Sequence, residues 1–292
     1  MIRRTLLIGG LLAVSTAGYG GAFLFALNNV DPDLIAHPSG YDGSGGSLTV
    51  KVCIVPGSSQ SLVIPVQNVV DRFNQFVPTV GNLRTGSDNE LDSGQFDFES
   101  VVFHELGHCI GLAHPNLANE SGLDNSLRDY TKTDQGVNGS FDLDAGGDGV
   151  QGSPDDNRGD DTNYHWFHVG VNDPFSLPAT VDGTNYSNDP AMLPTGDSFV
   201  ANGDRDVASL FGLPPTEAVM QQGQFNDELQ RALTADDVAT LMLARSGLDR
   251  TSGTGDDYSV TLEYGGISDA DSCDITVELS DQTSFAVCSV GG

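Results

Sequence analysis

The chain has 292 residues, which is enough for one large domain or two small ones. It carries 41 Asp and Glu residues against 12 Lys and Arg residues, so its formal net charge is −29. A balance this acidic argues against nucleic acid and against an anionic membrane surface as partners, because both require a basic patch. Hydrophobic residues make up 38% of the chain, which is enough for a core and argues against a wholly disordered acidic chain.

Residues 1–22 have the features of a secretory signal peptide. Two arginines form a positive n-region, a short apolar run extends to Val14, and small residues then place the cleavage site after Ala17 or Ala22. The alternative is an uncleaved anchor, because residues 5–27 carry no charge and are numerous enough to cross a bilayer. We expect a secreted, extracellular or periplasmic protein with no stable membrane partner, unless this segment stays uncleaved.

Residues 23–46, rich in Gly, Pro and Asp, are expected to be a lead-in or a short propeptide. Residues 47–250 are expected to form the main domain. It opens with an alternating, β-branched strand over 48–55, followed by a helix over 62–77 whose apolar residues recur every three or four positions. A short strand-and-turn region over 79–94 precedes a second helix, which the sequence places from Asp97 to about Leu112.

Residues 116–215 are rich in Gly, Asp, Asn, Ser and Pro, and they are expected to form an acidic, loop-rich insertion. A third helix is expected after Leu233. Thr234 can cap its N-terminus with Asp237 at the third helical position, and Gly247 can end it.

The C-terminal residues 251–292 are expected to form a small β appendage. Three short strand patterns occur there, over residues 258–264, 273–279 and 284–290.

Four cysteines occur in the chain, and an even number in an exported protein favours disulfide bonds. Cys273 and Cys288 flank a strand-turn-strand pattern, so we expect them to pair. That choice leaves Cys53 to pair with Cys109. The alternative is four buried free thiols.

The most informative segment is Phe103-His-Glu-Leu-Gly-His-Cys-Ile-Gly-Leu-Ala-His114. His104 and His108 are four residues apart, so on a helix they project from one face and can bind one Zn²⁺. Glu105 can reach a water at the metal without being a ligand. Gly111 can end the helix and turn the chain so that His114 reaches the same metal. Three neutral histidines leave one coordination position open, as in catalytic zinc sites.

These residues resemble the metzincin metallopeptidases, whose motif is HExxHxxGxxH followed by a Met-turn. Residues 96–104 and 233–241 are similar to segments of the matrixin branch, and the resemblance covers roughly residues 48–115 and 216–248. It implies an α/β (α+β) metzincin-like core, a twisted sheet with an active-site helix. It also implies that a methionine lies beneath the imidazoles. Met192 and Met220 both qualify, and Met220 is the better choice because it shortly precedes the third helix.

The resemblance implies a secreted zinc endopeptidase acting on protein or peptide substrates. Zn²⁺ would be held by His104, His108 and His114, and Glu105 would be the general base. Three features depart from the family. Few residues separate the first two helices, where matrixins place several strands. About a hundred residues lie between His114 and Met220, far more than in matrixins, and position 222 is Gln rather than Tyr or Pro. The alternative is an exported calcium-dependent binding or adhesion protein on an inactive peptidase scaffold.

Two further groups of residues in the insertion could bind cations. Asp142, Asp144 and Asp148 alternate with glycines, and they form either a Ca²⁺ loop or a solvated acidic loop. His165 and His168, three residues apart, either bind a second metal or are partly buried, hydrogen-bonded histidines.

Overall fold

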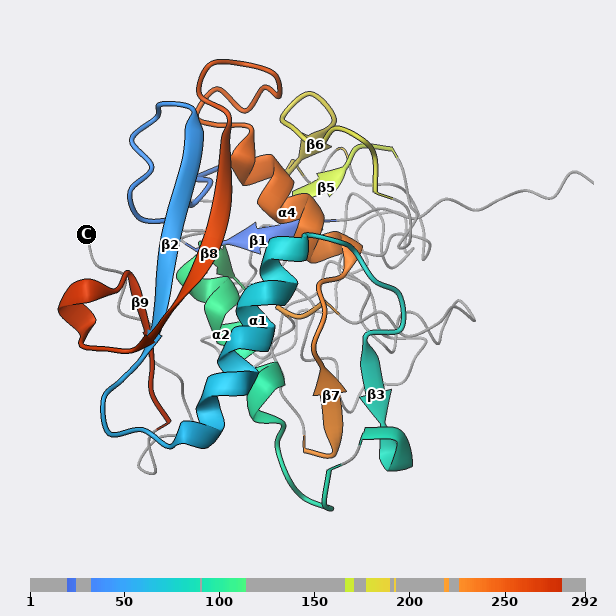
Figure 1. Cartoon of the computed structure of the whole chain (residues 1–292). Coiled ribbons are helices and arrows are strands. Elements are labelled where there is room, and N and C mark those ends of the chain that lie inside the picture. Colours follow the sequence, from blue (N-terminus) through green and yellow to red (C-terminus); the bar gives the residue numbers. More distant parts are fainter. Residues whose placement is uncertain are drawn as a thin grey trace, which may run out of the picture.

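The computed structural model describes residues 20–24, 33–89, 91–113, 166–170, 177–189, 192, 218–220 and 226–279 (Figure 1). These residues contain three α-helices and three small sheets, so the protein belongs to the α+β class, as expected.

Strand β2 (Gly46–Ile54) lies at the centre of the main sheet, between β8 (Tyr258–Ile267) and β9 (Ile275–Val277), and it is parallel to both. The end of β2 is fully buried, because paired neighbours cover both its edges and helices cover one face (Figure 1). The expected separate β appendage at the C-terminus is therefore wrong for residues 258–277. The period-two pattern predicts these strands but not their partner, which lies about two hundred residues earlier in the chain.

Helix α1 (Val63–Gln75) packs on β8 and α2, and it begins after a 3₁₀ turn over Gln60–Leu62. Its buried side chains are those that the helical period predicts: Val66, Val69, Val70 and Phe73. The helix ends at Phe76, which takes a left-handed conformation with φ of 51°. The Phe73 ring lies 4.5 Å from the ring of Phe103, which joins α1 to α2 (Phe98–Cys109).

Helix α4 (Ala235–Arg245) has the predicted capping box. The Asp237 carboxylate accepts from the backbone N–H and from the hydroxyl of Thr234, both at 2.8 Å. Gly247, with φ of 75°, follows its end as expected.

The four-stranded sheet has the order β4 (Leu112–Ala113), β1 (Gly20–Phe23), β5 (Trp166–His168), β6 (Tyr186–Ser187), with antiparallel pairing throughout. Strands β5 and β6 come from the segment expected to be loop-rich, so that segment contributes two short strands. Ala22 and Phe23 are each 1% exposed. The last three residues of the expected leader therefore lie within strand β1.

The third sheet is an antiparallel pair, β3 (Leu83–Thr85) with β7 (Glu228–Gln230), and short 3₁₀ turns occur over Gly86–Asn89 and Ala270–Ser272.

The expected cysteine pairing is wrong. Cys53 of β2 forms a disulfide with Cys273, just before β9, with the two Cα atoms 6.0 Å apart. Both expected pairs, Cys273–Cys288 and Cys53–Cys109, are excluded by this bond. Cys109 is also disulfide-bonded, and no described cysteine is a free thiol. The parallel pairing of β9 with β2 brings the two sulfurs together, and local sequence spacing does not contain that information.

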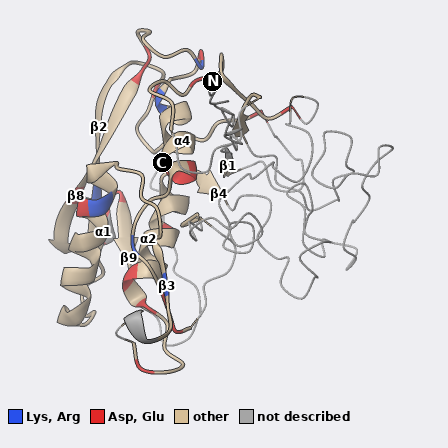
Figure 2. Ribbon diagram, turned by 90° about the vertical axis from the view of Figure 1, so that its right-hand side faces the viewer, with Lys and Arg blue, Asp and Glu red and all other residues tan. Residues whose placement is uncertain are grey.

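Asp and Glu residues recur along the described elements and loops, whereas Lys and Arg residues are few (Figure 2). In the described part of the chain, no helix is both long and apolar enough to cross a membrane.

Candidate metal centre

Helix α2 carries three of the four residues expected at the metal site. Asp97 caps its N-terminus by accepting hydrogen bonds from the Ser100 backbone N–H (2.8 Å) and hydroxyl (2.6 Å). The His104 and His108 rings then lie one turn apart, with centroids 4.8 Å from each other and planes nearly perpendicular. After α2, Gly111 takes a φ of 108°, and a Cβ there would lie 2.9 Å from the Ala36 carbonyl oxygen, so only glycine fits this turn.

Backbone carbonyls orient both imidazoles. His104 Nδ1 lies 2.7 Å from the Val219 carbonyl oxygen, and His108 Nδ1 lies 2.8 Å from the Leu112 carbonyl oxygen. A carbonyl oxygen can only accept, so in both rings Nδ1 carries the proton and Nε2 carries the lone pair. Metal-binding histidines usually have this arrangement, with one nitrogen fixed by a carbonyl and the other available as ligand. The donor chemistry of the pair therefore fits a zinc ion.

Burial favours the uncharged form of both imidazoles. Desolvation, together with the neighbouring His108, lowers the pKa of His104 to about 4, and its bond to Val219 opposes this only in part. Desolvation also lowers the pKa of His108. Both rings are thus neutral near pH 7, which is the form that binds a metal. Burial raises the pKa of the half-buried Glu105 carboxyl, which makes it a stronger base than an exposed glutamate.

Met220 packs directly against α2. A Cβ added to Gly107 would lie only 2.1 Å from the Met220 sulfur, so the thioether fills the space that glycine leaves between the two histidines of the motif. Met220 is 2% exposed, whereas Met192 is 48% exposed. Of the two candidates for the Met-turn, Met220 is therefore the buried one, and its thioether packs against α2.

Asp237 holds the Met220 turn in place. Its carboxylate accepts from the backbone N–H groups of Val219 (3.1 Å) and Met220 (3.4 Å), while it also completes the cap of α4. The backbone of Val219 therefore links the two side chains: its N–H donates to the Asp237 carboxylate, and its carbonyl oxygen accepts from the His104 ring. Gln230 adds a second tie, since its side-chain amide donates to the Ala218 carbonyl at 2.7 Å.

Sequence reasoning placed Asp237 only in the cap of α4 and missed its contact with the turn. A buried acid that serves two segments has no signature in local spacing. The position of a capping acid shortly after a candidate Met-turn is the one hint that the sequence contains.

Several expected residues lie outside the part of the chain that the structure describes: His114, His165, and the acidic residues Asp142, Asp144 and Asp148. Within the described residues, no three His, Cys, Asp or Glu side chains come together as a metal site. His168 is described, and its ring stacks on Tyr186 with centroids 5.2 Å apart. Its surroundings are aromatic, and desolvation lowers its pKa.

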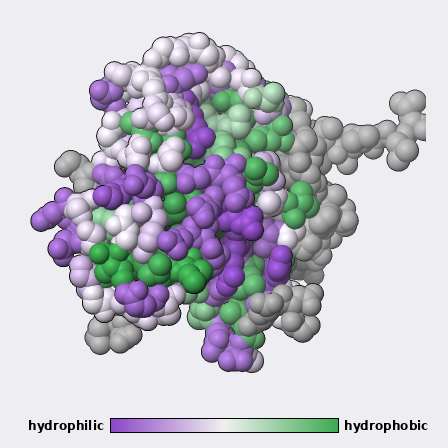
Figure 3. All heavy atoms as spheres, in the orientation of Figure 1, coloured by the Kyte–Doolittle hydropathy of each residue, from purple (hydrophilic) through white to green (hydrophobic). Residues whose placement is uncertain are grey.

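A separate groove of about 630 Å³ lies between α1 and the β3–β7 pair, where hydrophilic side chains gather on the surface (Figure 3). Its walls include Arg72, Arg84 and Arg231, together with Asp71 and Glu99. No aromatic side chain is among the described residues that line it, so it lacks the apolar walls typical of small-molecule sites.

Comparison with known proteins found no matching family model, no similar curated protein and no similar solved structure.

Proposed function

We propose that this protein is an exported zinc endopeptidase with a metzincin-like core. The observation that carries the proposal is the histidine pair on α2. The two rings lie one turn apart, both Nδ1 atoms are fixed by carbonyls, and the Met220 thioether packs against the helix between them. His104, His108 and, by the motif, His114 would hold the zinc ion.

A bound Zn²⁺ supplies Lewis-acid activation of water and of a peptide carbonyl near neutral pH. Glu105 accepts a proton at its carboxylate from the water that attacks the carbonyl carbon, and delivers this proton to the nitrogen of the departing amine. Its raised pKa suits both steps, because the group must take up and release a proton near neutral pH. The Val219 and Leu112 carbonyls hold the two imidazoles in one tautomer throughout.

Export is supported by the disulfide between Cys53 and Cys273, because such bonds persist mainly in oxidising compartments. The leader-like N-terminal residues support the same assignment.

The test is metal analysis of the purified protein, together with digestion of a peptide library with and without a chelator. We expect about one zinc per chain and chelator-sensitive cleavage.

Glu105→Gln should keep the zinc, and its cleavage rate should fall by at least about a hundredfold, the low end of what a general base contributes. Glu263→Gln, an exposed acid on β8, is the matched control and should leave both unchanged. A protein without zinc, or a Glu105→Gln variant that still cleaves, would refute the proposal.

A further inference from the structure

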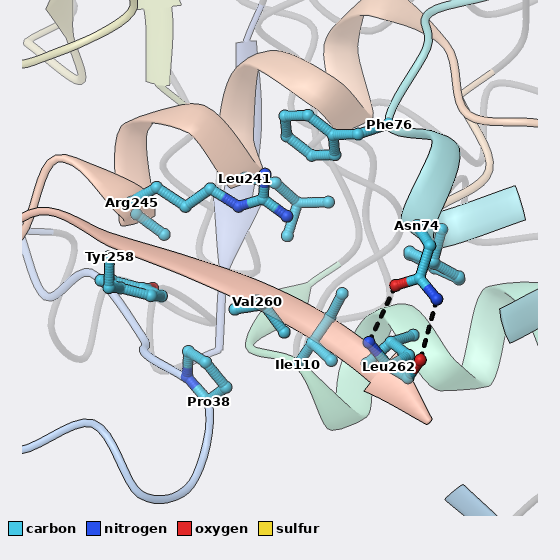
Figure 4. Close-up of a pocket in the computed structure, with 11 residues that line it drawn as sticks. Pro38, Asn74, Phe76, Ile110, Leu241, Arg245, Tyr258, Val260 and Leu262 are labelled. Carbon is cyan, nitrogen blue, oxygen red and sulfur yellow. Dashed lines mark hydrogen bonds between the residues drawn. The ribbon is translucent and has the colours of Figure 1, made fainter. Parts of the chain in front are cut away.

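A small pocket lies between the end of α1, the last turn of α4 and strand β8 (Figure 4). Most of its walls are apolar, and Ile110, two residues after His108, forms part of them. Of the described residues that line the pocket, only Arg245 carries a charge. The cavity has a volume of about 20 Å³, which is room for one particle the size of a water molecule.

The Arg245 guanidinium has no anionic partner in this pocket. It lies over the Phe76 ring, with its central carbon 3.7 Å from the ring centroid. No carboxylate of the described residues forms an ion pair with it, although the chain holds 41 Asp and Glu residues. Burial lowers the pKa of the Arg245 guanidinium.

The other polar groups of the pocket are already engaged. The Asn74 side chain donates to the Leu262 carbonyl and accepts from the Leu262 N–H, both at 2.8 Å (Figure 4). The Tyr258 hydroxyl lies 3.1 Å from His37 Nδ1. The N–H groups of Arg245 are therefore the hydrogen-bond donors that remain for a ligand in the pocket. A guanidinium group can donate hydrogen bonds but cannot accept them. An occupant must accept hydrogen bonds.

We propose that this pocket binds a small monovalent anion, chloride or the carboxylate of a small acid, on the Arg245 guanidinium. A water molecule could accept the same hydrogen bonds, but it would leave the partly buried Arg245 cation without a counter-charge, which is unfavourable where the dielectric constant is lower than in bulk water. The C-terminal dipole of α4 and the Phe76 ring compensate only part of that charge. A chloride ion fits the small volume, and a carboxylate would place one oxygen in it.

Such an anion would link three elements that meet at the pocket. Arg245 belongs to α4, Phe76 ends α1, and Tyr258 begins β8. A ligand that binds only the folded arrangement stabilises it by mass action. The expected effect is therefore on thermal stability, and it does not depend on the proposed peptidase activity.

The experiment measures the thermal unfolding midpoint at constant ionic strength in sodium chloride, sodium formate and sodium gluconate, the last an anion too large for the cavity. We expect chloride or formate to raise the midpoint saturably by roughly 2–4 °C over gluconate. A chloride response identifies a halide site and a formate response a carboxylate site. Arg245→Gln should lose the response. Arg250→Gln, which alters a cation that lies over Trp166 instead, should keep it.

Crystals of the wild-type protein soaked in bromide and in formate give a direct test that does not depend on the folding of a variant. An anomalous bromide peak, or formate density, beside the Arg245 guanidinium would support the proposal. Soaked crystals that show no anion at Arg245 would overturn it if, in addition, the midpoints were equal in the three salts. The same crystals would overturn it if Arg245→Gln retained the response.

Discussion

Gly107, between the two motif histidines, is the residue whose size most directly controls the candidate metal centre. A Cβ there would lie 2.1 Å from the Met220 sulfur and 3.1 Å from its methyl carbon, so Gly107→Ala must displace the Met220 side chain. Overpacking of this kind costs about 1–3 kcal/mol, against the roughly 1 kcal/mol that alanine gains over glycine within a helix. We expect lower stability by urea unfolding and weaker zinc retention by metal analysis.

Gly255→Ala is the matched control, because its added Cβ meets nothing within 4 Å. It should leave both stability and zinc content near those of the wild type. If Gly107→Ala behaved like Gly255→Ala, the close packing of Met220 on α2 would not control the site.

The buried carboxylate of Asp97 provides a pH prediction at the same scale. Burial alone would raise its pKa, but hydrogen bonds from Arg231 and Ser100 outweigh burial, and its pKa lies below the ordinary value of 3.8. A depressed carboxyl pKa stabilises the fold above the unfolded pKa, and that contribution is lost as pH falls through the folded pKa.

Arg231→Gln should therefore lower the free energy of unfolding at pH 7 by about 1–2 kcal/mol, a value reduced by screening because the arginine is 41% exposed. It should also move acid unfolding to higher pH. Urea unfolding between pH 3 and 7 measures both effects. Arg72→Gln, an exposed arginine on α1 bonded to Gln75, should change neither, and an unchanged acid profile in Arg231→Gln would contradict the assignment.

At the scale of elements, local sequence signals predicted the helices well. The helical period located α1, Asp97 and Gly111 bounded α2, and Thr234 with Asp237 located the start of α4. Each signal lies within one turn of the backbone group that it satisfies, so spacing alone reveals it. The motif likewise placed two imidazoles and Glu105 on one helix, because an i, i+4 pair shares a face.

Pairing between distant segments could not be predicted in this way. The strand patterns of β8 and β9 were visible in the sequence, but their positions beside β2 depend on contacts about two hundred residues apart in the chain. In the site, the carbonyl of Val219 that orients His104 was missed for the same reason, since any residue supplies a carbonyl. The pattern of side chains in a sequence does not indicate which backbone carbonyl will contact a given residue.

Strand β1 gives a prediction about export processing. It lies between β4 and β5, and a Cβ on Gly21 would lie 1.7 Å from the Thr240 hydroxyl, so the strand is packed tightly against α4. Cleavage after Ala22 would remove three of its four residues and expose the neighbouring strands. If the proposed leader is cleaved, we therefore expect the mature chain to begin before Gly20, consistent with cleavage after Ala17.

Intact-mass measurement and N-terminal sequencing of the mature protein test this expectation. A shortened form that begins at Phe23 should have lower thermal stability than one that begins at Gly18. A natural N-terminus at Phe23 in a stable protein would show that β1 is dispensable.

At the scale of the whole molecule, the main sheet joins an early segment of the chain to a late one. The central strand β2 comes early in the chain and both its neighbours come late, and the Cys53–Cys273 disulfide closes a loop of 220 residues across the same junction. Strand β8 also packs closely on this disulfide, because a Cβ on Gly265 would lie 2.5 Å from the Cys53 sulfur.

Replacing both cysteines, Cys53→Ala with Cys273→Ala, should lower the free energy of unfolding by about 3–5 kcal/mol, since cross-links that close long loops remove the most entropy from the unfolded chain. Urea unfolding measures the loss, and peptide mapping without reductant should recover Cys53 joined to Cys273. Reductant is the internal control: at a concentration that opens this bond, it should destabilise the wild type by more than it destabilises the double variant. A map joining Cys53 to Cys109, or equal effects of reductant on both proteins, would contradict this bond, and with it the junction of β2 and β9 that brings the two sulfurs together.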